Sequence, residues 1–537
     1  MDGSSNNRKR GTSKKFIIFI ITALLIIGGS VSAFVLLNIS DKQKYFLAEK
    51  TSFEVIGDQF EKRFEPELNW QENVQDNPVD TTLELSATYN DPNANLTTFG
   101  PAQIINNSTL TIHNAMDTKE KRMATEVSGA FGGITIDGLN FYLTSNKLLV
   151  ELPFLKELLQ VKDADVGKLL HEVDPTVYTG KEKVDFETFF NGSEVLSKDD
   201  QKYLQKEYLE TIYDNLPDDA FKAADDSIKV NEKSIDAEKL TFHLSEKQVK
   251  DILSSTMKRM KDDKRLKEII KEQLAIQTLG AGVSTSNLTP GLQNDLDDMM
   301  EEFDTTLENA IKQLESFQIP DGMTSTIWVR DDLIVKRDFS LTMGPSEDEL
   351  LTFTINGTQI LGESNQTFDY TLGFIEGAKD SATAENELTV TGDLSWKNNK
   401  ADDSIKLAAG DGEFTYEGTS TLKDGKRDFE RIFALKTGTD EGQLTWSGNA
   451  AYNEDKMNSE NTLSLQLPGM PEDVFSLQVA KDAKLIKKVE IPQDQDVKDI
   501  GSMKVNEIMQ YFQNEVTPQF QKWAFKIMGT SGNLNGF

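Results

Sequence analysis

Histidine is the residue type in this chain best suited to metal binding and proton transfer, and the chain has three of them. His113, His171 and His243 lie far apart in the sequence, on different expected elements, and do not form a metal-binding motif. We therefore expect no metal site and no cofactor. His171 or His243 would take part in catalysis only if folding gathered carboxylates around one of them in a cleft.

Carboxylates are the second group that could do chemistry, and five of them crowd the stretch from Asp295 to Glu302. Such a stretch could attract a calcium ion weakly. An EF-hand loop needs oxygen ligands at fixed alternation and a glycine for its turn, and that glycine is missing here. The hydrophobic spacing around this stretch predicts a helix, so we interpret the carboxylates as its solvated surface.

Known catalytic motifs are missing from the sequence. It contains no Gly-x-Ser-x-Gly elbow, no Walker loop, no His-Glu-x-x-His and no dinucleotide-binding glycine motif with an acidic partner. The chain has no cysteine, which excludes thiol catalysis and cysteine metal sites. We assign no catalytic residues and predict that the protein is not an enzyme.

The composition narrows the class of protein. A net charge of −32 makes nucleic-acid binding improbable, because the phosphate backbone would be repelled. With 37% hydrophobic residues the 537-residue chain can build real cores. The lack of cysteine fits an envelope protein of a bacterium that avoids disulfides, although compositional drift would also explain it.

An uncharged run of 24 residues from Phe16 to Ile39 is long enough for a transmembrane helix. Five basic residues and one acidic residue precede it, which predicts a cytoplasmic N-terminus. The alternative is a signal peptide cleaved after Ala33. The apolar run continues through Leu37, which favours a retained anchor. We therefore expect a single-pass protein of the cell membrane with a large extracellular C-terminal domain.

Hydrophobic spacing predicts the elements outside this anchor. A helix over 41–64, stopped at Pro66, precedes an antiparallel meander over 80–150 with a turn at Asp137-Gly138. Further helices are expected within 151–222 and over 246–279.

The second half of the chain begins with an acidic helix over 291–317. From 323 to 490 the residues alternate with period two, which predicts strands separated by turns. The turns are expected at sites such as 330–332, Asn356-Gly357 and Asp424-Gly425. A helix over about 499–528 closes the chain.

One local pattern resembles a known group of proteins. Leu240 to Leu244 lead into a helix with a capping box, and Ser325 to Arg337 read as a hairpin of sequence STIWVRDDLIVKR. This arrangement resembles the LolA-like and LppX-like lipoproteins over roughly 75–345. The resemblance implies an unclosed half-barrel that wraps helices around a hydrophobic cavity and handles lipids. The chain departs from that group because it has a transmembrane segment in place of a lipidated cysteine and about 150 further residues after Gly344. Its layout also resembles uncharacterised membrane proteins of Firmicute bacteria.

The predicted fold class is therefore α+β. An N-terminal transmembrane helix precedes a large antiparallel β-sheet ectodomain of curved half-barrel type with packed helices. The expected divisions are a cytoplasmic tail (1–15), the transmembrane helix (16–39), a juxtamembrane helix and linker (40–74), the half-barrel-like region (75–345), a β-meander (346–498) and a C-terminal helix and tail (499–537).

The predicted function is that of a membrane-anchored extracytoplasmic binding protein of the bacterial envelope, for a lipid or another lipophilic ligand. Phe242, Ile327, Trp328 and Ile334 are the candidates to line its cavity. The same pattern also fits a fully packed core, and the alternative function is a non-catalytic cell-surface scaffold with protein partners. The expected partners are the membrane, through the N-terminal helix, and a lipophilic ligand, with no nucleic acid.

Overall fold

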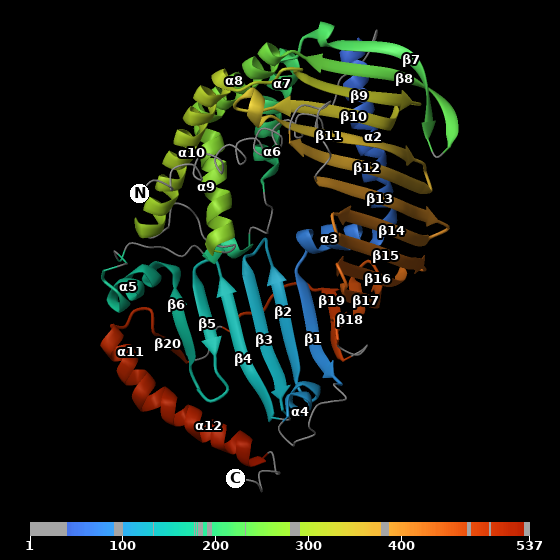
Figure 1. Cartoon of the computed structure of the whole chain (residues 1–537). Coiled ribbons are helices and arrows are strands. Elements are labelled where there is room, and N and C mark those ends of the chain that lie inside the picture. Colours follow the sequence, from blue (N-terminus) through green and yellow to red (C-terminus); the bar gives the residue numbers. More distant parts are fainter. Residues whose placement is uncertain are drawn as a thin grey trace, which may run out of the picture.

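The computed structural model describes residues 40–530, apart from 91–99, 133, 177, 179, 181–185, 191–195, 231, 280–289, 377–385, 470–473 and 493–495. Its main feature is one sheet of 20 strands (Figure 1). The strands are β1 (Val79–Tyr89), β2 (Thr109–Asp117), β3 (Arg122–Phe131), β4 (Ile134–Thr144), β5 (Lys147–Glu151), β6 (Leu158–Lys162), β7 (Phe221–Val230), β8 (Lys233–Leu244), β9 (Met323–Arg330), β10 (Leu333–Met343), β11 (Leu351–Leu361), β12 (Asn365–Glu376), β13 (Asn386–Lys397), β14 (Lys400–Ala409), β15 (Gly412–Lys423), β16 (Lys426–Thr437), β17 (Asp440–Tyr452), β18 (Lys456–Gln466), β19 (Phe475–Leu485) and β20 (Val497–Asp499).

The first strands of the chain continue the sheet that the last strands build. Strands β7 to β19 pair antiparallel, each with the next in the sequence. Strand β19 then pairs with β1 over eleven residue pairs, and β1 starts a second antiparallel run through β6. The short β20 lies parallel to β6. The long β19–β1 ladder therefore joins the two runs into one sheet.

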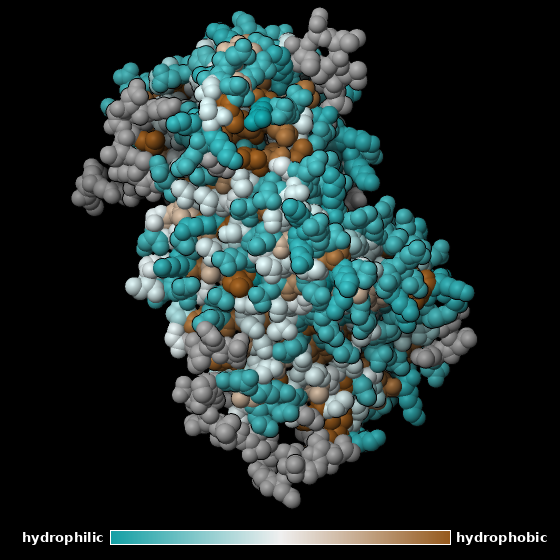
Figure 2. All heavy atoms as spheres, turned by 90° about the vertical axis from the view of Figure 1, so that its right-hand side faces the viewer, coloured by the Kyte–Doolittle hydropathy of each residue, from teal (hydrophilic) through white to brown (hydrophobic). Residues whose placement is uncertain are grey.

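One face of the sheet is apolar from β10 through β19 and on into β4. Strand register aligns apolar side chains into cross-strand rows, because alternate residues of a strand point to the same face. Two such rows are Phe339, Ile355, Leu372 and Leu388, and Phe433, Leu444, Leu465 and Phe475. The molecular side in Figure 2 is mainly hydrophilic, with hydrophobic residues gathered near the top of the view.

The helices pack against the apolar face and leave parts of it half-exposed. Tyr45 and Phe46 of α2 join the main core, Trp70 of α3 packs on Val79 and Ala483, and Tyr511 of α11 packs near β6. The helices are α2 (Asp41–Arg63), α3 (Glu65–Asp76), α4 (Pro101–Asn106), α5 (Asp163–Val173), α6 (Lys198–Leu204), α7 (Thr211–Asn215), α8 (Glu246–Asp262), α9 (Lys264–Leu279), α10 (Pro290–Ser316), α11 (Val505–Tyr511) and α12 (Thr517–Thr530). Figure 1 shows α8 to α10 together at one end of the molecule and α11 and α12 at the other.

The helix predicted over 41–64 is present as α2. Ser40 caps it, accepting from the backbone N–H of Gln43 while the Gln43 side chain accepts from the Ser40 N–H. The chain bends at Phe64, and Pro66 falls in the first turn of a second helix, α3, instead of ending helical structure. Proline is tolerated there because the first N–H groups of a helix have no internal partner.

The hairpin predicted around 330–332 is confirmed. Asp331 and Asp332 form the two-residue connection between β9 and β10, and both have left-handed φ angles, 52° and 61°. Hairpins with two-residue connections need such angles, which aspartate tolerates better than most residues.

Two other predicted turns are wrong. Asn356-Gly357 lies within β11, where the ring of Tyr370 covers the space that a Cβ on Gly357 would occupy. Asp137-Gly138 lies within β4, where the pairing with β3 shifts register and Gly138 has a φ of 76°. Glycine therefore marks a close aromatic contact in the first case and an irregularity of the ladder in the second.

The predicted fold class is also wrong. Strands from 75–345 and from 346–498 belong to one 20-stranded sheet, where a half-barrel behind a transmembrane helix was expected. In the part of the chain from Ser40 onward that the structure describes, no helix is long and apolar enough to span a membrane. The predicted anchor, Phe16 to Ile39, lies outside the described residues. The residue boundaries of the predicted domains stay predictions.

Candidate functional site

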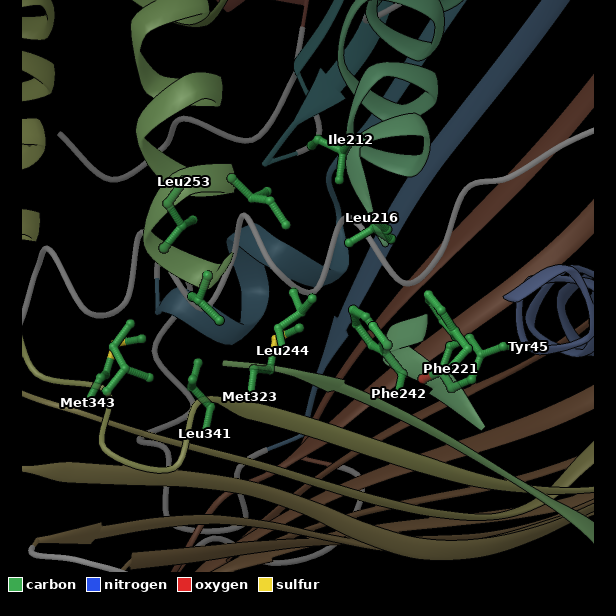
Figure 3. Packing of buried hydrophobic residues seen from close by; sticks show 14 of the residues in the cluster. Tyr45, Ile212, Leu216, Phe221, Phe242, Leu244, Leu253, Met323, Leu341 and Met343 are labelled. Carbon is green, nitrogen blue, oxygen red and sulfur yellow. The ribbon is translucent and has the colours of Figure 1, made fainter. Parts of the chain in front are cut away.

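A partly open cavity of about 270 Å³ lies between α2 and the apolar face of the sheet. Side chains of α7 and α8 contribute to its wall, together with residues of strands β8 to β12. We call this space the α2 cavity. In Figure 3, Tyr45, Phe221 and Phe242 come from α2, β7 and β8 and lie close together, while Ile212 and Leu216 approach from α7.

Aromatic rings fix the position of α2 at this cavity. The rings of Phe221 and Phe242 stack with centroids 4.5 Å apart. Tyr45 meets both of them, with centroid distances of 5.6 Å to Phe221 and 5.9 Å to Phe242. Such pairs contribute about 0.5–1.5 kcal/mol each beyond the area that they bury. The first two turns of α2 are therefore firmly docked on the sheet.

A bulge in β10 allows a hydrogen bond to α2 and brings the charged side chain of Arg337 into the cavity. The register with β9 shifts between Ile334 and Lys336, and the N–H of Ile334 donates to the Ser52 hydroxyl of α2 at 3.0 Å. Ile334 and Arg337 are three residues apart, so an undisturbed strand would point them to opposite faces. The inserted residue brings both to the apolar face, which is how Arg337 reaches the cavity.

Arg337 forms a buried ion pair with Glu49 of α2. Its Nη2 donates to Glu49 Oε2 at 2.6 Å, and the two side chains are only 22% and 6% exposed. Burial by itself would lower the pKa of Arg337, but the adjacent Glu49 carboxylate outweighs it and raises that pKa. Glu49 Oε1, the second carboxylate oxygen, is buried and has no hydrogen-bond partner.

Two phenols and a hydroxyl complete the polar lining. The Tyr45 and Ser325 hydroxyls share a hydrogen bond of 2.6 Å, and the Tyr370 hydroxyl donates to Gln359 Oε1 at 2.9 Å. Burial raises the pKa of Tyr45 to about 12 and also raises the pKa of Tyr370. Both phenols therefore stay protonated at neutral pH and act as neutral hydrogen-bonding groups.

The predicted cavity residues fall at three different places. Phe242 lines the α2 cavity. Ile327 and Ile334 are almost fully buried in the packed core beside it. Trp328 points to the opposite face of the sheet, where its Nε1 donates to Asp226 at 2.8 Å and the Lys239 and Lys336 ammonium groups lie over its ring. A contact between any of these residues and a ligand stays a prediction.

Sequence reasoning missed the polar residues of the cavity. Tyr45, Glu49 and Ser52 lie at helical spacing on the buried side of the predicted helix, so a carboxylate and a hydroxyl on that side were a usable signal. Arg337 gave no such signal, because its direction depends on the bulge.

The structure gives each histidine its own local partner. His113 pairs with Asp80, His171 contacts the Tyr178 carbonyl at 2.6 Å, and His243 contacts the Thr324 hydroxyl at 2.9 Å. Among the described residues, no group of three or more histidines and carboxylates has the geometry to hold a metal ion. Part of the acidic helix pairs with lysines of a neighbouring helix, as in the contact between Asp297 and Lys271.

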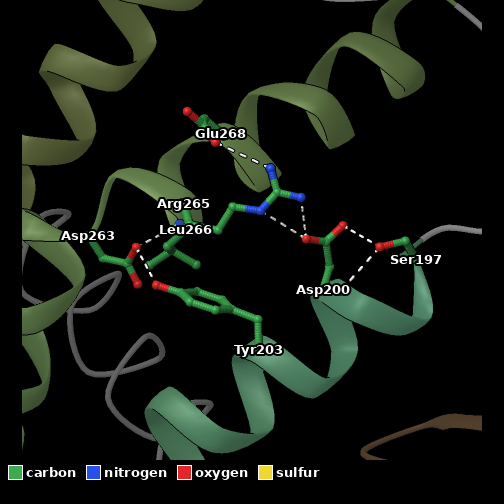
Figure 4. Close-up of polar contacts among 7 residues, drawn as sticks. All are labelled: Ser197, Asp200, Tyr203, Asp263, Arg265, Leu266 and Glu268. Atoms are coloured by element: carbon green, nitrogen blue, oxygen red, sulfur yellow. Dashed lines mark hydrogen bonds and ion pairs between the residues drawn. The ribbon is translucent and has the colours of Figure 1, made fainter.

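A second polar cluster joins the segment α6–α7 to the junction of α8 and α9, and Figure 4 shows its main contacts. The hydroxyls of Tyr203 and Tyr208 donate to the two oxygens of Asp263, at 2.8 and 2.5 Å. Arg265 donates to Asp200, whose other oxygen accepts from Ser197 at 2.6 Å. These donors and acceptors satisfy one another, so the cluster is a structural joint and not a binding site.

No protein family model and no curated protein matches this chain. Among solved structures, OccK3 (OpdO) of Pseudomonas aeruginosa has 6% identity over 76% of this chain and 95% of its own, with a TM-score of 0.23. A BenF-like porin from Pseudomonas fluorescens Pf-5 has 6% identity over 76% of this chain and 97% of its own, with a TM-score of 0.25. At such low TM-scores the likeness transfers neither a fold nor a transport function to this chain.

The predicted family is nevertheless wrong, because the strands of 75–345 do not form a half-barrel of their own and continue into one 20-stranded sheet with those of 346–498. The function, partners and localisation that followed from it are corrected as well. The strands expected to form a lipid-enclosing half-barrel belong instead to one 20-stranded sheet, and in the described part of the chain no helix is long and apolar enough to span a membrane.

Proposed function

We propose that this protein binds a compact small molecule in the α2 cavity and holds it without converting it. The proposal rests on the convergence of five polar side chains on a partly open and otherwise apolar space, namely Tyr45, Glu49, Ser325, Arg337 and Tyr370. Sites for small molecules are typically concave and mainly apolar, with a few placed polar groups that orient the ligand.

The size of the cavity limits the ligand. The space between these residues is partly open, since the lining residue Phe53 is exposed, and its volume is about 270 Å³. It equals the volume of about nine water molecules at roughly 30 Å³ each. This lies just below the usual range for drug-sized ligands, about 300–1,000 Å³. The ligand is therefore a single compact molecule, much smaller than a two-chain lipid.

The chemistry of the lining favours binding over catalysis. Ser325 is the hydroxyl that could serve as a nucleophile, and its partner is the Tyr45 phenol. A base must accept a proton near neutral pH, and a phenol whose pKa burial raises to about 12 is already protonated there. The Arg337 guanidinium cannot accept a proton at all. The Glu49 carboxylate makes no hydrogen bond to Ser325, because its Oε2 pairs with Arg337 and its Oε1 has no hydrogen-bond partner.

Cavity filling tests this proposal. Benzene and benzamide are titrated into the full chain and followed by ligand-observed NMR, because a benzene ring fits an apolar cavity of about 150 Å³. Leu216→Trp places an indole in the cavity and is expected to weaken binding at least about tenfold, or 1.4 kcal/mol. Leu467→Trp, at an exposed site outside the cavity, is the control and should bind as the wild type does.

The proposal fails if neither compound binds the wild type. It also fails if Leu216→Trp folds with an unchanged circular dichroism spectrum and binds as tightly as the wild type, since the compounds would then occupy another site.

A further inference from the structure

Glu49 Oε1 is an acceptor without a donor. The Glu49 side chain is 6% exposed and lies at the wall of the α2 cavity, and its Oε2 is already paired with Arg337. A buried acceptor that lacks a partner loses the hydrogen bonds that water gave it in the unfolded chain. A ligand that supplies an N–H or O–H at this point restores one of them.

Arg337 lies beside Glu49 and provides hydrogen-bond donors. A guanidinium carries five N–H donors, and the Arg337 side chain lines the same cavity. Its Nη2 donates to Glu49. Its positive charge also offsets part of the rise in pKa that burial causes at the neighbouring phenols of Tyr45 and Tyr370. A ligand acceptor placed beside Arg337 therefore meets a charged donor that is fixed in position by an ion pair.

The charge of the pair limits the charge of the ligand. Glu49 and Arg337 neutralise one another, so a bound anion or cation would add an uncompensated charge to a buried space. Uncompensated charges are strongly disfavoured in such surroundings, whereas a neutral group with both a donor and an acceptor is not.

We infer that the ligand of the α2 cavity carries a neutral primary amide, whose N–H donates to Glu49 Oε1 and whose carbonyl accepts from Arg337. This inference rests on the proposed binding function and names the chemical class of its ligand. The apolar remainder of the molecule lies against Phe46, Leu216 and Phe242.

Three probes of nearly the same shape share a benzene ring and differ in their polar head group, so their affinities show which head group the cavity prefers. Benzamide offers a donor and an acceptor without charge, benzoate offers acceptors with a negative charge, and benzamidinium offers donors with a positive charge. Toluene carries a methyl group in place of the polar head group, so its affinity measures the contribution of the ring to binding. Titration into the full chain by ligand-observed NMR is expected to show benzamide binding at least about tenfold more tightly than each of the other three, the factor for 1.4 kcal/mol.

Substitutions in the Glu49–Arg337 ion pair should change which probe binds most tightly. Glu49→Gln leaves Arg337 without its counter-ion, so the tightest probe should become benzoate. Arg337→Met leaves Glu49 without its counter-ion, so the tightest probe should become benzamidinium. Glu238→Gln removes another ion pair of α2, with Lys44, which does not line the cavity, and should keep the wild-type order. A gain of affinity for a new probe cannot result from misfolding.

The outcomes separate the two levels of the proposal. If all four probes bind wild type alike, or if any probe other than benzamide binds most tightly, the amide is excluded while the binding function stands. If the order of the probes is unchanged in Glu49→Gln and in Arg337→Met, the head group does not contact this pair and the inference is overturned. If no probe binds, the proposed function itself is lost.

Discussion

Buried charges hold α2 and α3 on the apolar face at three places. Glu49 pairs with Arg337 at one end, Arg63 pairs with Asp403 farther along, and the fully buried Arg427 pairs with Glu67 at 2.5 Å. Buried ion pairs add little net stability because desolvation offsets their attraction, but removing one partner is costly. At the residue scale these pairs fix the position of the helices on a surface that is mainly apolar.

Asp403 is the member of these pairs for which a pH dependence is expected. Burial raises its pKa even though Arg63 is adjacent, so the folded state retains the proton at pH values where the unfolded chain has lost it. Stability must therefore fall as the pH rises from about 3.9, the ordinary pKa of aspartate, to the higher pKa of the folded state. Asp403→Asn lacks this loss. The free energy of unfolding of Asp403→Asn should therefore rise relative to that of the wild type as the pH increases from about 3.9 to the higher pKa of the folded state.

Urea denaturation of both proteins at a series of pH values from 3.5 to 7 measures this difference. Asp402→Asn, an exposed neighbour on the same strand, is the control and should run parallel to the wild type. A difference that instead shrinks as the pH rises would mean that the attraction of Arg63 outweighs burial at Asp403.

At the scale of elements, the Asp263 cluster determines how α6–α7 and α8 close the α2 cavity. Burial opposes ionisation of Asp263, but hydrogen bonds from Tyr208, Tyr203 and the Leu266 backbone outweigh it and lower the pKa. The stability that these bonds provide is present above pH 3.9 and is lost as the pH falls toward the lowered pKa. Bonds to a charged group contribute about 1.5–3 kcal/mol.

Asp263→Asn is therefore expected to lower the free energy of unfolding by about 1–3 kcal/mol at pH 7 and by less at pH 3. The matched control is Asp262→Asn, because Asp262 is exposed and adjacent. Chemical denaturation at the two pH values gives both numbers. An equal loss in the two variants, or a loss that does not depend on pH, would show that the phenol–carboxylate contacts do not stabilise this joint.

Sequence reasoning succeeded where one local signal determines one local outcome. Hydrophobic spacing predicted the helix over 41–64 that is present as α2, and Asp331 and Asp332 specify a two-residue hairpin. It failed at Asn356-Gly357 because glycine at that position is explained by the Tyr370 ring on the next strand, which the local sequence does not contain. It missed Arg337 in the cavity for the same reason, since the bulge depends on pairing with β9. The apolar face was predictable from alternation, but the joining of β1 to β19 was not.

At the scale of the whole molecule, β1 and β19 form the connection between two groups of strands that are distant in the sheet. Strands β2–β4 and β8–β10 both fall in the predicted region 75–345, yet in the sheet they are linked only through β11 to β19 and β1. Neighbours in the sheet share hydrogen bonds and side-chain contacts, so cooperative unfolding should follow sheet order and not the order of the chain.

Val479→Pro tests this expectation, because Val479 pairs with Asn461 of β18 and with Leu85 of β1, and proline removes a donor from the centre of that ladder. Hydrogen exchange with mass spectrometry in increasing urea should show the wild type losing protection in β2–β4, β8–β10 and β13–β16 at one urea concentration. In Val479→Pro, β2–β4 should lose protection first, while β8–β10 and β13–β16 stay together. Val497→Pro in the short outer strand β20 is the control and should leave all three groups coupled. If β2–β4 instead stays coupled to β8–β10 and separates from β13–β16, the predicted boundary between residues 345 and 346 governs folding, and the continuity of the sheet does not.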